Sequence, residues 1–424
     1  MFTTLNPHVL RLQFPSLQQE VNGQSALFLD GPGGTQTPWG VIEAMSDYLL
    51  RDNSNQGGRF ATSQRTDALL AATRQAAADF LNAARPQEIV FGANMTSLTF
   101  HLSRALSQTW QPGDEIIVTR LDHDANISPW LLAARDRGAT VRWLDFHAED
   151  CTLALEELPH LLTDKTRLVA VTYASNAVGS ITDVARVVRL SQAAGAQVYV
   201  DAVHYAPHGA IDVQALDCDY LVCSPYKFFG PHSGILYGKY DRLESLAAYK
   251  VRPAANQPPG KWETGTPNFE SIAGIRAAIQ YLTTIGELYA GPDLPHLAAY
   301  TGVRRQLKTA LYLIQQHESA LSLRFLAGAA GIPGLRVYGI TDIERLNERT
   351  PTFAVSLAGY TPPQLAQKLA DQGIFVWDGH YYAVAVMERL GLLDQGGLVR
   401  IGFVHYNTTA EVDRLLQALK ELAQ

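Results

Sequence analysis

Residues 217–238, DCDYLVCSPYKFFGPHSGILYG, place a single lysine, Lys227, between an apolar run and a glycine-punctuated strand. Lysine is among the residues least often buried, because an ammonium group without a partner loses its hydration when it leaves water. A lysine in this setting therefore reaches back to solvent, pairs with an acid, or takes part in a reaction.

The chain around this stretch alternates between helical and strand patterns from about residue 65 to residue 240. The pattern predicts helices over residues 66–84, 98–106, 128–138 and 182–195, and strands over residues 88–93, 114–121, 140–146, 167–176 and 197–205. Such alternation predicts an α/β fold with a mostly parallel sheet covered by helices on both faces. Its ligand site is expected beyond the carboxyl ends of the strands.

A break rich in glycine and proline, YAGPDLPH at residues 289–296, precedes a second and smaller α/β unit. We predict three parts from this pattern. Residues 1–25 form an N-terminal segment packed on the small unit, residues 26–290 form the large ligand-binding domain, and residues 291–424 form the small C-terminal domain.

The composition is that of an ordinary globular protein, with 47% hydrophobic and 18% charged residues. A net charge of -7 argues against nucleic acid as a partner. Neither a secretory leader nor a run of about 18 apolar residues is apparent, so we expect no export and no membrane span. The three cysteines, Cys151, Cys218 and Cys223, are too few and too scattered for a disulfide framework and fit a reducing cytoplasm.

A lysine in a shielded pocket has its ammonium form disfavoured, so its amine is available as a Schiff-base nucleophile, and pyridoxal phosphate (PLP) is the usual aldehyde. A PLP site also needs an acid beside the pyridine nitrogen, donors for the phosphate, a flat group over the ring and a cation for the substrate carboxylate. Asp201, which ends the strand QVYVD, is placed to be that acid, although an aspartate at a strand end is by itself more often a turn or cap residue.

Other residues match the remaining demands, each with a plain structural alternative. Thr96 and Ser97 stand where a strand gives way to a helix and can meet a phosphate, or simply cap the helix. His123 follows a strand and can stack on a cofactor ring, or lie in a surface loop. Arg400, inside an apolar strand, can bind a substrate carboxylate or form an internal salt bridge.

Two other ligand classes fit less well. His204 and His208 have the spacing of a helical metal pair, but Pro207 between them breaks the helix that the pair requires, so we expect no metal. Neither GxxxxGK[ST] nor GxGxxG occurs, which disfavours a nucleotide. A nucleotide-binding dehydrogenase is the unrelated alternative.

Several motifs together resemble those of the class V aminotransferase family of fold type I PLP enzymes, and specifically its cysteine desulfurase-like branch. They are FLDGPGGTQTP (28–38), NMTSLTF (94–100), LDHDANISPW (121–130), TYASNAVGSITDV (172–184), VDAVHYAPHG (200–209), SPYKFFGPHSGILYG (224–238), ETGTPNFE (263–270) and VRIGFVHYNT (399–408). They occur in the family's order and span nearly the whole chain.

The resemblance implies a role for each matching residue. Catalysis would fall to Lys227, which forms the Schiff base, to His123, which stacks on the ring, and to Asp201, which pairs with the pyridine nitrogen. The implied cofactor-binding residues also include Thr96, Ser97, Asn176, His204, Ser224 and Thr266, the last contributed by a second subunit, so a homodimer with shared active sites is implied. Arg400 would take the substrate carboxylate, and Gly33, Asn55 and the loop from Trp377 to Tyr382 would surround the substrate side chain.

Three departures from the desulfurase pattern bear on function. Desulfurases carry a catalytic cysteine in a loop resembling GHHCAMP, whereas the matching segment here, DGHYYAVAV, has Tyr382 in its place. Tyr226 precedes the lysine where desulfurases commonly have histidine, and His204 replaces their usual glutamine, as in relatives of the isopenicillin epimerase type.

We therefore predict a carbon–sulfur lyase that performs β-elimination on cysteine, cystine or an S-substituted cysteine, because this reaction needs no enzyme thiol. An aminotransferase, an amino-acid epimerase, a desulfurase that uses another thiol and a non-catalytic PLP-binding protein are the alternatives left open.

Overall fold

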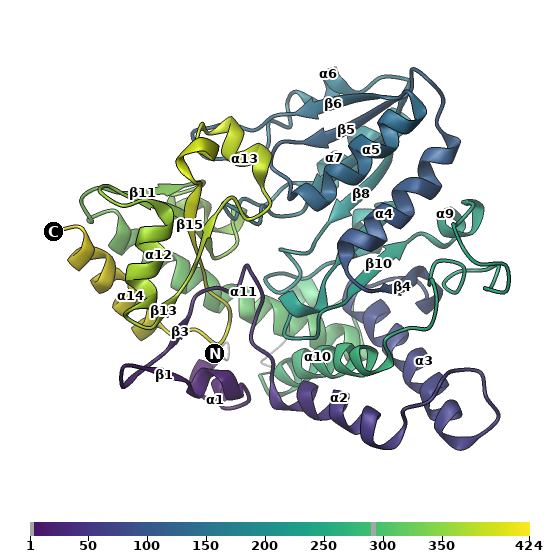
Figure 1. The fold of residues 1–424 in the computed structure, drawn as a ribbon, viewed down its shortest axis with the longest axis horizontal. Helices are drawn as coiled ribbons and strands as arrows, with labels where there is room; N and C mark the ends of the chain where they lie inside the picture. Colours follow the sequence, from purple (N-terminus) through teal and green to yellow (C-terminus); the bar gives the residue numbers. More distant parts are fainter. Residues whose placement is uncertain (1–3, 290–293) are drawn as a thin grey trace.

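A seven-stranded sheet in the order β4-β10-β9-β8-β7-β5-β6 forms the centre of the larger part of the chain (Figure 1). The structure is a computed structural model that describes residues 4–289 and 294–424. Strands β5 to β9 run parallel, and only β10 pairs antiparallel, with β4 and β9. The predicted mostly parallel sheet is confirmed. The strands are β4 Ile89–Gly92, β5 Glu115–Thr119, β6 Thr140–Leu144, β7 Thr166–Thr172, β8 Gln197–Asp201, β9 Tyr220–Cys223 and β10 Gly234–Gly238.

Helices cover both faces of this sheet. Since successive side chains of a strand point to opposite sides, each strand contributes to two apolar cores. In β8, Val198 and Val200 belong to the core that includes helices α3, α7 and α10, whereas Tyr199 belongs to the core that includes α4 and α5. The helices of this part are α2 Trp39–Arg51, α3 Ala61–Leu81, α4 Met95–Leu106, α5 Ser128–Arg137, α6 Leu158–Leu161, α7 Val184–Ala193, α8 Val213–Leu216, α9 Tyr240–Ser245 and α10 Phe269–Leu288. The α/β prediction with helices on both faces therefore holds.

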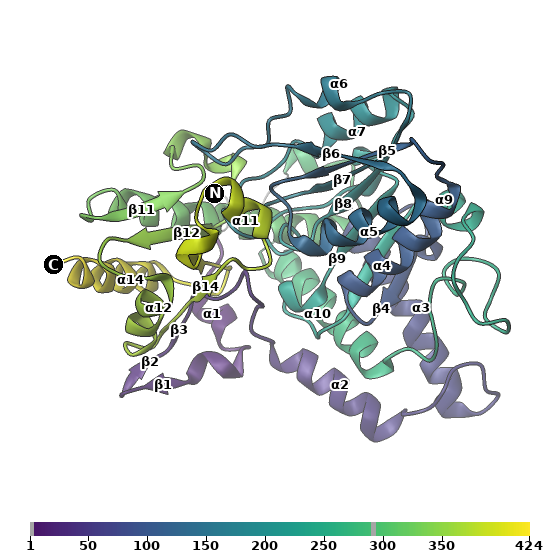
Figure 2. The same cartoon turned by 45° about the horizontal axis from the view of Figure 1, so that its top comes forward.

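A second sheet, antiparallel and in the order β11-β12-β15-β14, builds the smaller part of the chain, seen beside the large sheet in Figure 2. It packs with helices α11, α12 and α14 around a separate apolar core that includes Phe325, Phe353 and Phe403. The elements are α11 Gly302–Ala329, β11 Leu335–Tyr338, β12 Thr352–Leu357, α12 Pro362–Ala370, β13 Ile374–Phe375, β14 Trp377–Gly379, α13 Val384–Arg389, β15 Leu398–Gly402 and α14 Thr409–Leu422.

The N-terminal region contacts both parts. It contains α1 Pro7–Arg11, β1 Glu20–Val21, β2 Gln24–Ser25 and β3 Leu27–Phe28. Strand β3 pairs in parallel with β13 of the smaller part, although the sequence assigns residues 27–28 to the large domain. The ring of Phe14 packs against Phe229 as well as Tyr406. The expected domain boundary at residues 290–291 lies outside the described residues, and the three ranges stay a prediction.

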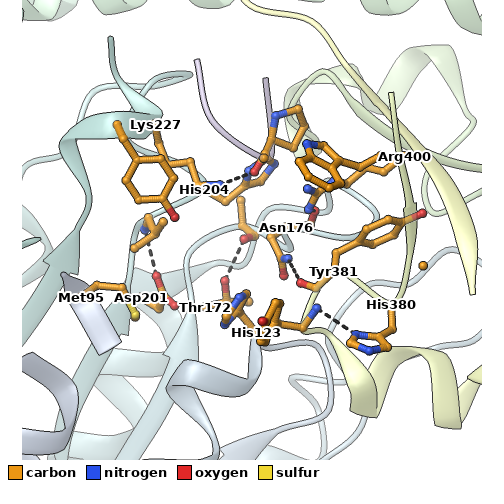
Figure 3. A pocket seen from close by; sticks show the side chains of 18 of the residues that line it. Met95, His123, Thr172, Asn176, Asp201, His204, Lys227, His380, Tyr381 and Arg400 are labelled. Carbon is orange, nitrogen blue, oxygen red and sulfur yellow. Dashed lines mark hydrogen bonds between the residues drawn. The ribbon is translucent and has the colours of Figure 1, made fainter. Parts of the chain in front are cut away.

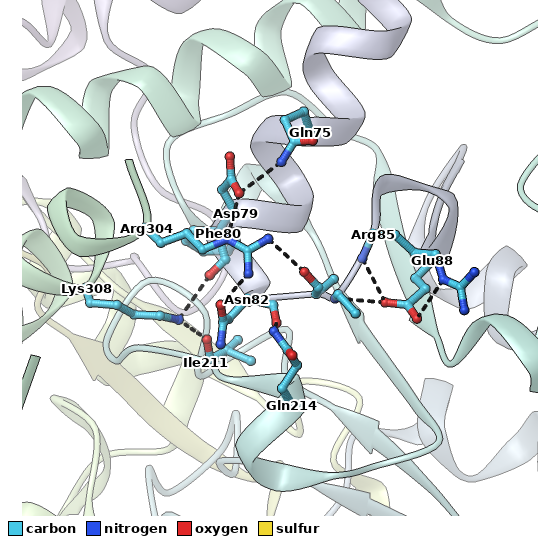
Figure 4. Close-up of polar contacts among 12 residues, drawn as sticks. Gln75, Asp79, Phe80, Asn82, Arg85, Glu88, Ile211, Gln214, Arg304 and Lys308 are labelled. Atoms are coloured by element: carbon cyan, nitrogen blue, oxygen red, sulfur yellow. Dashed lines mark hydrogen bonds and ion pairs between the residues drawn. The ribbon is translucent and has the colours of Figure 1, made fainter. Parts of the chain in front are cut away.

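Helix α11 connects the smaller part to the end of α3 (Figure 4). The guanidinium of Arg304 lies 2.8 Å from Asp79 and donates to Asn82 at 2.7 Å and to the carbonyl of Ala83 at 2.8 Å. One turn later, the buried amine of Lys308 donates to the carbonyls of Phe80 and Ile211. These contacts fix the long helix against the large sheet's helical layer. None of the helices within the two described ranges is both long and apolar enough to cross a membrane.

Candidate active site

A cavity of about 430 Å³ lies between the two parts of the chain, beyond the carboxyl ends of the parallel strands (Figure 3). Eight of the predicted site residues line it: Gly33, Thr96, His123, Asn176, Asp201, His204, Lys227 and Arg400. They come from seven separate segments, because Asp201 and His204 share the end of β8 and the turn after it. The parallel strands bring most of them together, since each strand of such a sheet ends at the same edge. Trp377, His380, Tyr381 and Tyr382 line the cavity from the smaller part.

Lys227 lies in a short 3-10 turn directly after β9 and is 9% exposed. Its Nζ donates to the carbonyl of Pro32. Burial, reinforced by the nearby charge of Arg400, lowers the pKa of Lys227 well below its usual range, while Asp201 and Asp30 act in the opposite direction. The uncharged form of the amine is therefore favoured relative to that of an exposed lysine, as a nucleophile or a base requires.

Asp201 is the last residue of β8 and lies beside Thr172 of β7 in the register of the sheet. Its Oδ1 accepts a hydrogen bond of 2.9 Å from the backbone N–H of Val203. Burial raises the pKa of Asp201 to about 6, against the opposing effects of this hydrogen bond and of Lys227. A carboxylate so placed is ionised at neutral pH and is strongly stabilised by any cation that enters the cavity.

His123 is held by its own turn. Its Nδ1 accepts a hydrogen bond of 2.9 Å from the N–H of Ala125, so the neutral ring carries its proton on Nε2. Burial, followed by the charges of Lys227 and Arg400, lowers the pKa of His123 to about 4. The ring is therefore neutral at pH 7 and suited to stacking and to hydrogen-bond donation.

The turn that carries His123 is fixed by Asp122, a residue that the sequence did not single out. Asp122 accepts hydrogen bonds from the hydroxyl of Thr119 and, at 2.6 Å, from the amide of Asn126. Burial raises the pKa of Asp122 to about 8, and the neighbouring charge of Asp201 adds to this shift. The signal in the sequence that could have identified Asp122 is its position directly before the candidate residue His123.

Arg400 and Asn176 are joined across the cavity. Nη1 of Arg400 donates to the carbonyl of Asn176 at 2.9 Å, and its guanidinium lies 4.4 Å from the ring centroid of Tyr381. The contact is a backbone carbonyl rather than the internal carboxylate that the sequence left open. The Nε of Arg400 and the Oδ1 of Asn176 are both buried without a hydrogen-bond partner in the described part of the chain. Both groups are thus available to a ligand.

Thr96 and Ser97, adjacent in sequence, are placed differently. Thr96 lines the cavity at the N-terminus of α4, whereas Ser97 does not. Asn94 caps α4 by accepting from the N–H of Ser97 at 2.8 Å, and the hydroxyl of Ser97 donates back to the carbonyl of Asn94 at 2.9 Å. Ser97 therefore takes part in the helix cap that the sequence offered as its alternative. The hydroxyl of Ser224, three residues before Lys227, is buried and has no partner among residues 4–289 and 294–424.

Two further predicted residues lie outside the cavity wall. Thr266 lines a neighbouring cavity of about 540 Å³ together with Ser97 and His232. Asn55 is exposed, and its side-chain oxygen accepts from the N–H of Gln56 at 2.9 Å. By contrast, Gly33 is in close contact with the cavity wall, because a Cβ atom at this position would lie 2.2 Å from Nε1 of Trp377.

The loop after β14 has an unusual backbone. Tyr381 and Tyr382 adopt positive φ values of 52° and 57°, which residues other than glycine rarely adopt. The amide of Asn176 donates to the carbonyl of Tyr381 at 2.9 Å, and the N–H of Asp124 donates to that of Tyr382 at 2.7 Å. This loop is thus bonded to the large sheet's turns on both sides of the cavity.

No thiol lines the cavity. The chain's three cysteines, Cys151, Cys218 and Cys223, are all buried and unpaired. Burial is the main cause that raises the pKa of Cys151 and Cys218 to about 12 and that of Cys223 still higher. Such thiols are inert.

One cavity neighbour, Asp30, lies in the motif FLDGPGGTQTP, but the sequence assigned it no role. Asp30 ends the run FLD before the glycine loop, and its buried Oδ1 has no partner in the described structure. Burial raises the pKa of Asp30 to about 6, despite the nearby charges of Arg400 and Lys227. A charged residue directly after an apolar run was the only signal.

The residues present fit PLP. The cavity offers a lysine amine of lowered pKa, a buried acid, a flat neutral ring and a helix N-terminus, as the cofactor's aldehyde, pyridine nitrogen, ring face and phosphate require. The unpartnered polar atoms of Asn176, Ser224 and Arg400 agree with a site built for a polar ligand.

Comparison with known proteins places this geometry in a family. The model of class V aminotransferases matches residues 27–291 and 292–415. A cysteine desulfurase of Dickeya dadantii is 32% identical over 428 residues, which cover 97% of this chain and 96% of the relative. The structure of an Escherichia coli cysteine desulfurase superposes with a TM-score of 0.82 at 29% identity, covering 98% of each chain. That of a Thermococcus onnurineus cysteine desulfurase does so with a TM-score of 0.86 at 26% identity, covering 100% of this chain and 99% of the other. The chain therefore belongs to the class V aminotransferase family and is a pyridoxal phosphate-dependent enzyme of the cysteine desulfurase-like branch.

Proposed function

We propose that this enzyme is a carbon–sulfur lyase that performs β-elimination on cysteine, cystine or an S-substituted cysteine. The observation that carries the proposal is the loop after β14, where Tyr382 stands at the position of the expected cysteine and no thiol lines the cavity. The relatives named cysteine desulfurase also break a carbon–sulfur bond, so the proposal keeps the bond and changes the fate of the sulfur.

Bound PLP supplies the aldehyde that Lys227 engages and an electron-withdrawing ring that stabilises negative charge developing at the substrate's Cα. The amine of Lys227, whose pKa burial lowers, takes the proton from Cα. The electron pair left on Cα forms a double bond to Cβ, and the Cβ–S bond breaks, so sulfur leaves with its electron pair. The unsaturated amino acid that remains hydrolyses to pyruvate and ammonia.

The other cavity residues position the reactants. With PLP bound, Asp201 would stabilise the protonated pyridine nitrogen, and the neutral ring of His123 would stack on the cofactor. Arg400 binds the substrate carboxylate through the Nε that lacks a partner in the described chain. Asn176, bonded to both Arg400 and the Tyr381 carbonyl, fixes the distance between the carboxylate site and the loop.

The walls of the cavity favour a substrate with a substituent on sulfur. Trp377, Tyr381 and Tyr382 line the side away from the large sheet, and aromatic rings gain most from contact with apolar groups. Free cysteine offers only a thiol to these rings. We therefore expect S-alkyl or S-aryl cysteines to react with a higher kcat/KM than cysteine.

Incubation of the purified protein with PLP and cysteine, cystine or S-benzylcysteine, without a keto acid, tests the proposal. Pyruvate and ammonia are expected in equal amounts, and Lys227→Ala is expected to form neither. A product that appears only after a keto acid is added would replace the lyase with an aminotransferase. Loss of the substrate's optical activity without pyruvate would replace it with an epimerase.

We also propose a homodimer with shared active sites in a reducing cytoplasm. Thr266 and Ser97 lie in the cavity next to the one lined by Lys227, and large apolar side chains such as Trp39, Leu49 and Phe60 are exposed. The three unpaired cysteines favour the reducing compartment. Light scattering of the eluting holoenzyme is expected to give twice the 46.4 kDa chain mass, and a monomer that retains full activity would contradict the shared site.

A further inference from the structure

His204 lines the cavity and is held by residues that the proposed chemistry does not use. It lies in the turn after β8, is 3% exposed, and has its Nε2 3.2 Å from the hydroxyl of Thr350. Burial, followed by the charges of His208, Arg400 and Lys227, lowers the pKa of His204 well below its usual range. A protonated imidazole here would be repelled by the guanidinium of Arg400, so a neutral ring fits the cavity.

His208 packs against His204 and is bonded to a buried acid. The two imidazole rings are 5.3 Å apart at their centroids and inclined by 66°. Nδ1 of His208 lies 2.8 Å from Oε2 of Glu318, which lies 110 residues later on α11. His208 is 4% exposed and Glu318 is 2% exposed. The contact therefore joins the turn after β8 to the long helix in a region shielded from water.

Packing alone does not account for Glu318. Its Oε1 has no hydrogen-bond partner in the described part of the chain, and burial raises its pKa. The groups that face it are His208, the more distant His317 and the backbone of His405. An apolar side chain of similar size would fill this position without the cost of removing a carboxylate from water.

We propose that His208 and Glu318 form a positioning pair for His204. A carboxylate bonded to Nδ1 fixes the tautomer and the ring plane of a histidine. The fixed ring of His208 then holds the ring plane of His204, and the burial that the two packed rings share opposes protonation of His204. Neither His208 nor Glu318 lines the cavity, so both act through His204. This pair keeps His204 neutral, in one orientation, at the cofactor site.

Glu318→Gln tests the pair, because it removes the charge and keeps the size of the side chain. Ser322→Ala is the matched control: the Ser322 hydroxyl donates to the Glu318 backbone carbonyl at 2.8 Å, so its loss leaves the carboxylate in place. Nitrogen NMR of the cofactor-free protein, with labelled histidine rings, reports the tautomer of His204. The wild type and Ser322→Ala are expected to show one neutral tautomer between about pH 5.5 and pH 8. Glu318→Gln is expected to show two tautomers or a titration in this range.

A second readout uses the holoenzyme. The pH midpoint of the bound cofactor's absorbance is expected to move by about half a pH unit or more in Glu318→Gln and not in Ser322→Ala. His208→Gln, whose amide can still donate to Glu318, is expected to change His204 in the same way and serves if Glu318→Gln does not fold. Folded variants with the wild-type His204 signals would overturn the pair. The NMR readout decides this even if the proposed lyase reaction is absent.

Discussion

The ring of Tyr382 lies nearly parallel to the ring of His123, with 5.4 Å between their centroids and 14° between their planes. The stack joins the loop after β14 to the turn after β5, and the backbone bond from Asp124 to Tyr382 supports it. The loop position at which the desulfurase resemblance leads one to expect a thiol is thus occupied by a ring that closes one side of the cavity.

Tyr382→Phe is expected to keep this wall, and Tyr382→Ala to remove it. Loss of an aromatic pair costs about 1 kcal/mol, or roughly fivefold in kcat/KM for S-benzylcysteine. Cysteine, which does not reach the wall, should be affected less. Steady-state pyruvate formation with both substrates measures the difference, and an equal loss for both would show that Tyr382 does not contact the substituent.

Lys227→Met is expected to stabilise the cofactor-free chain by about 1 kcal/mol while abolishing activity. The reason is that a buried amine with one hydrogen bond, to the carbonyl of Pro32, gives way to an apolar side chain of similar length. Urea unfolding at pH 7 measures the change. A less stable Lys227→Met would show that the amine contributes to folding and is not held at a cost.

Arg400→Lys is expected to raise KM far more than it lowers kcat, because an ammonium cannot offer the two parallel donors of a guanidinium to the substrate carboxylate. The expected loss is about 2 kcal/mol, or roughly 30-fold in kcat/KM. A substrate analogue without the carboxylate provides the control, since the wild type and the variant should turn it over equally poorly. A variant with unchanged KM would remove Arg400 from the carboxylate site.

Asp201 gives the cofactor-free chain a specific dependence on pH. Because burial raises its pKa from 3.8 to about 6 in the folded chain, the folded chain binds more protons than the unfolded chain between about pH 4 and pH 6. Stability contributed by this group therefore falls as pH rises through that window, by up to about 3 kcal/mol, and is level above it. Urea unfolding of the wild type and Asp201→Asn at several pH values isolates the effect from Asp30 and Asp122. Parallel curves for the two proteins would contradict it.

The junction between α11 and α3 is expected to contribute to stability through Arg304. Arg304→Ala removes the partly buried contacts to Asp79, Asn82 and the Ala83 carbonyl, at an expected cost of about 1 to 2 kcal/mol in the free energy of unfolding. Arg324→Ala, which removes an equally well-formed but half-exposed pair with Asp413, is the control and should cost less than about 1 kcal/mol. Equal melting temperatures for the two variants would contradict the prediction.

The placement of the site residues shows which of their positions can be predicted from local sequence. Lys227, Asp201 and His123 follow strand ends, and the parallel sheet necessarily brings such positions to one edge, so their convergence was predictable. Ser97 also follows a strand, but whether its hydroxyl faces a ligand or caps α4 depends on the orientation of Asn94, which the sequence pattern does not show.

Residues that act from a distance could not be predicted from the sequence, because their contacts depend on how distant segments pack together. Glu318 reads as one polar position on a long amphipathic helix, and only the docking of α11 against the turn after β8 turns it into the partner of His208. In the sequence, Asp30 resembles an ordinary loop residue. Only the packing of the smaller part against the larger part buries it near Arg400 and Lys227.

The sequence by itself determined the α/β alternation and the lack of a cysteine after residue 223, and it predicted Lys227 as the reactive lysine and Asp201 as its acid, because periodicity and residue chemistry are local properties. The tertiary structure alone decided which of these groups share a cavity, which are desolvated and how their pKa values shift. Those properties depend on contacts between segments 100 and more residues apart, such as Arg400 with Asn176, and on the water that their packing excludes.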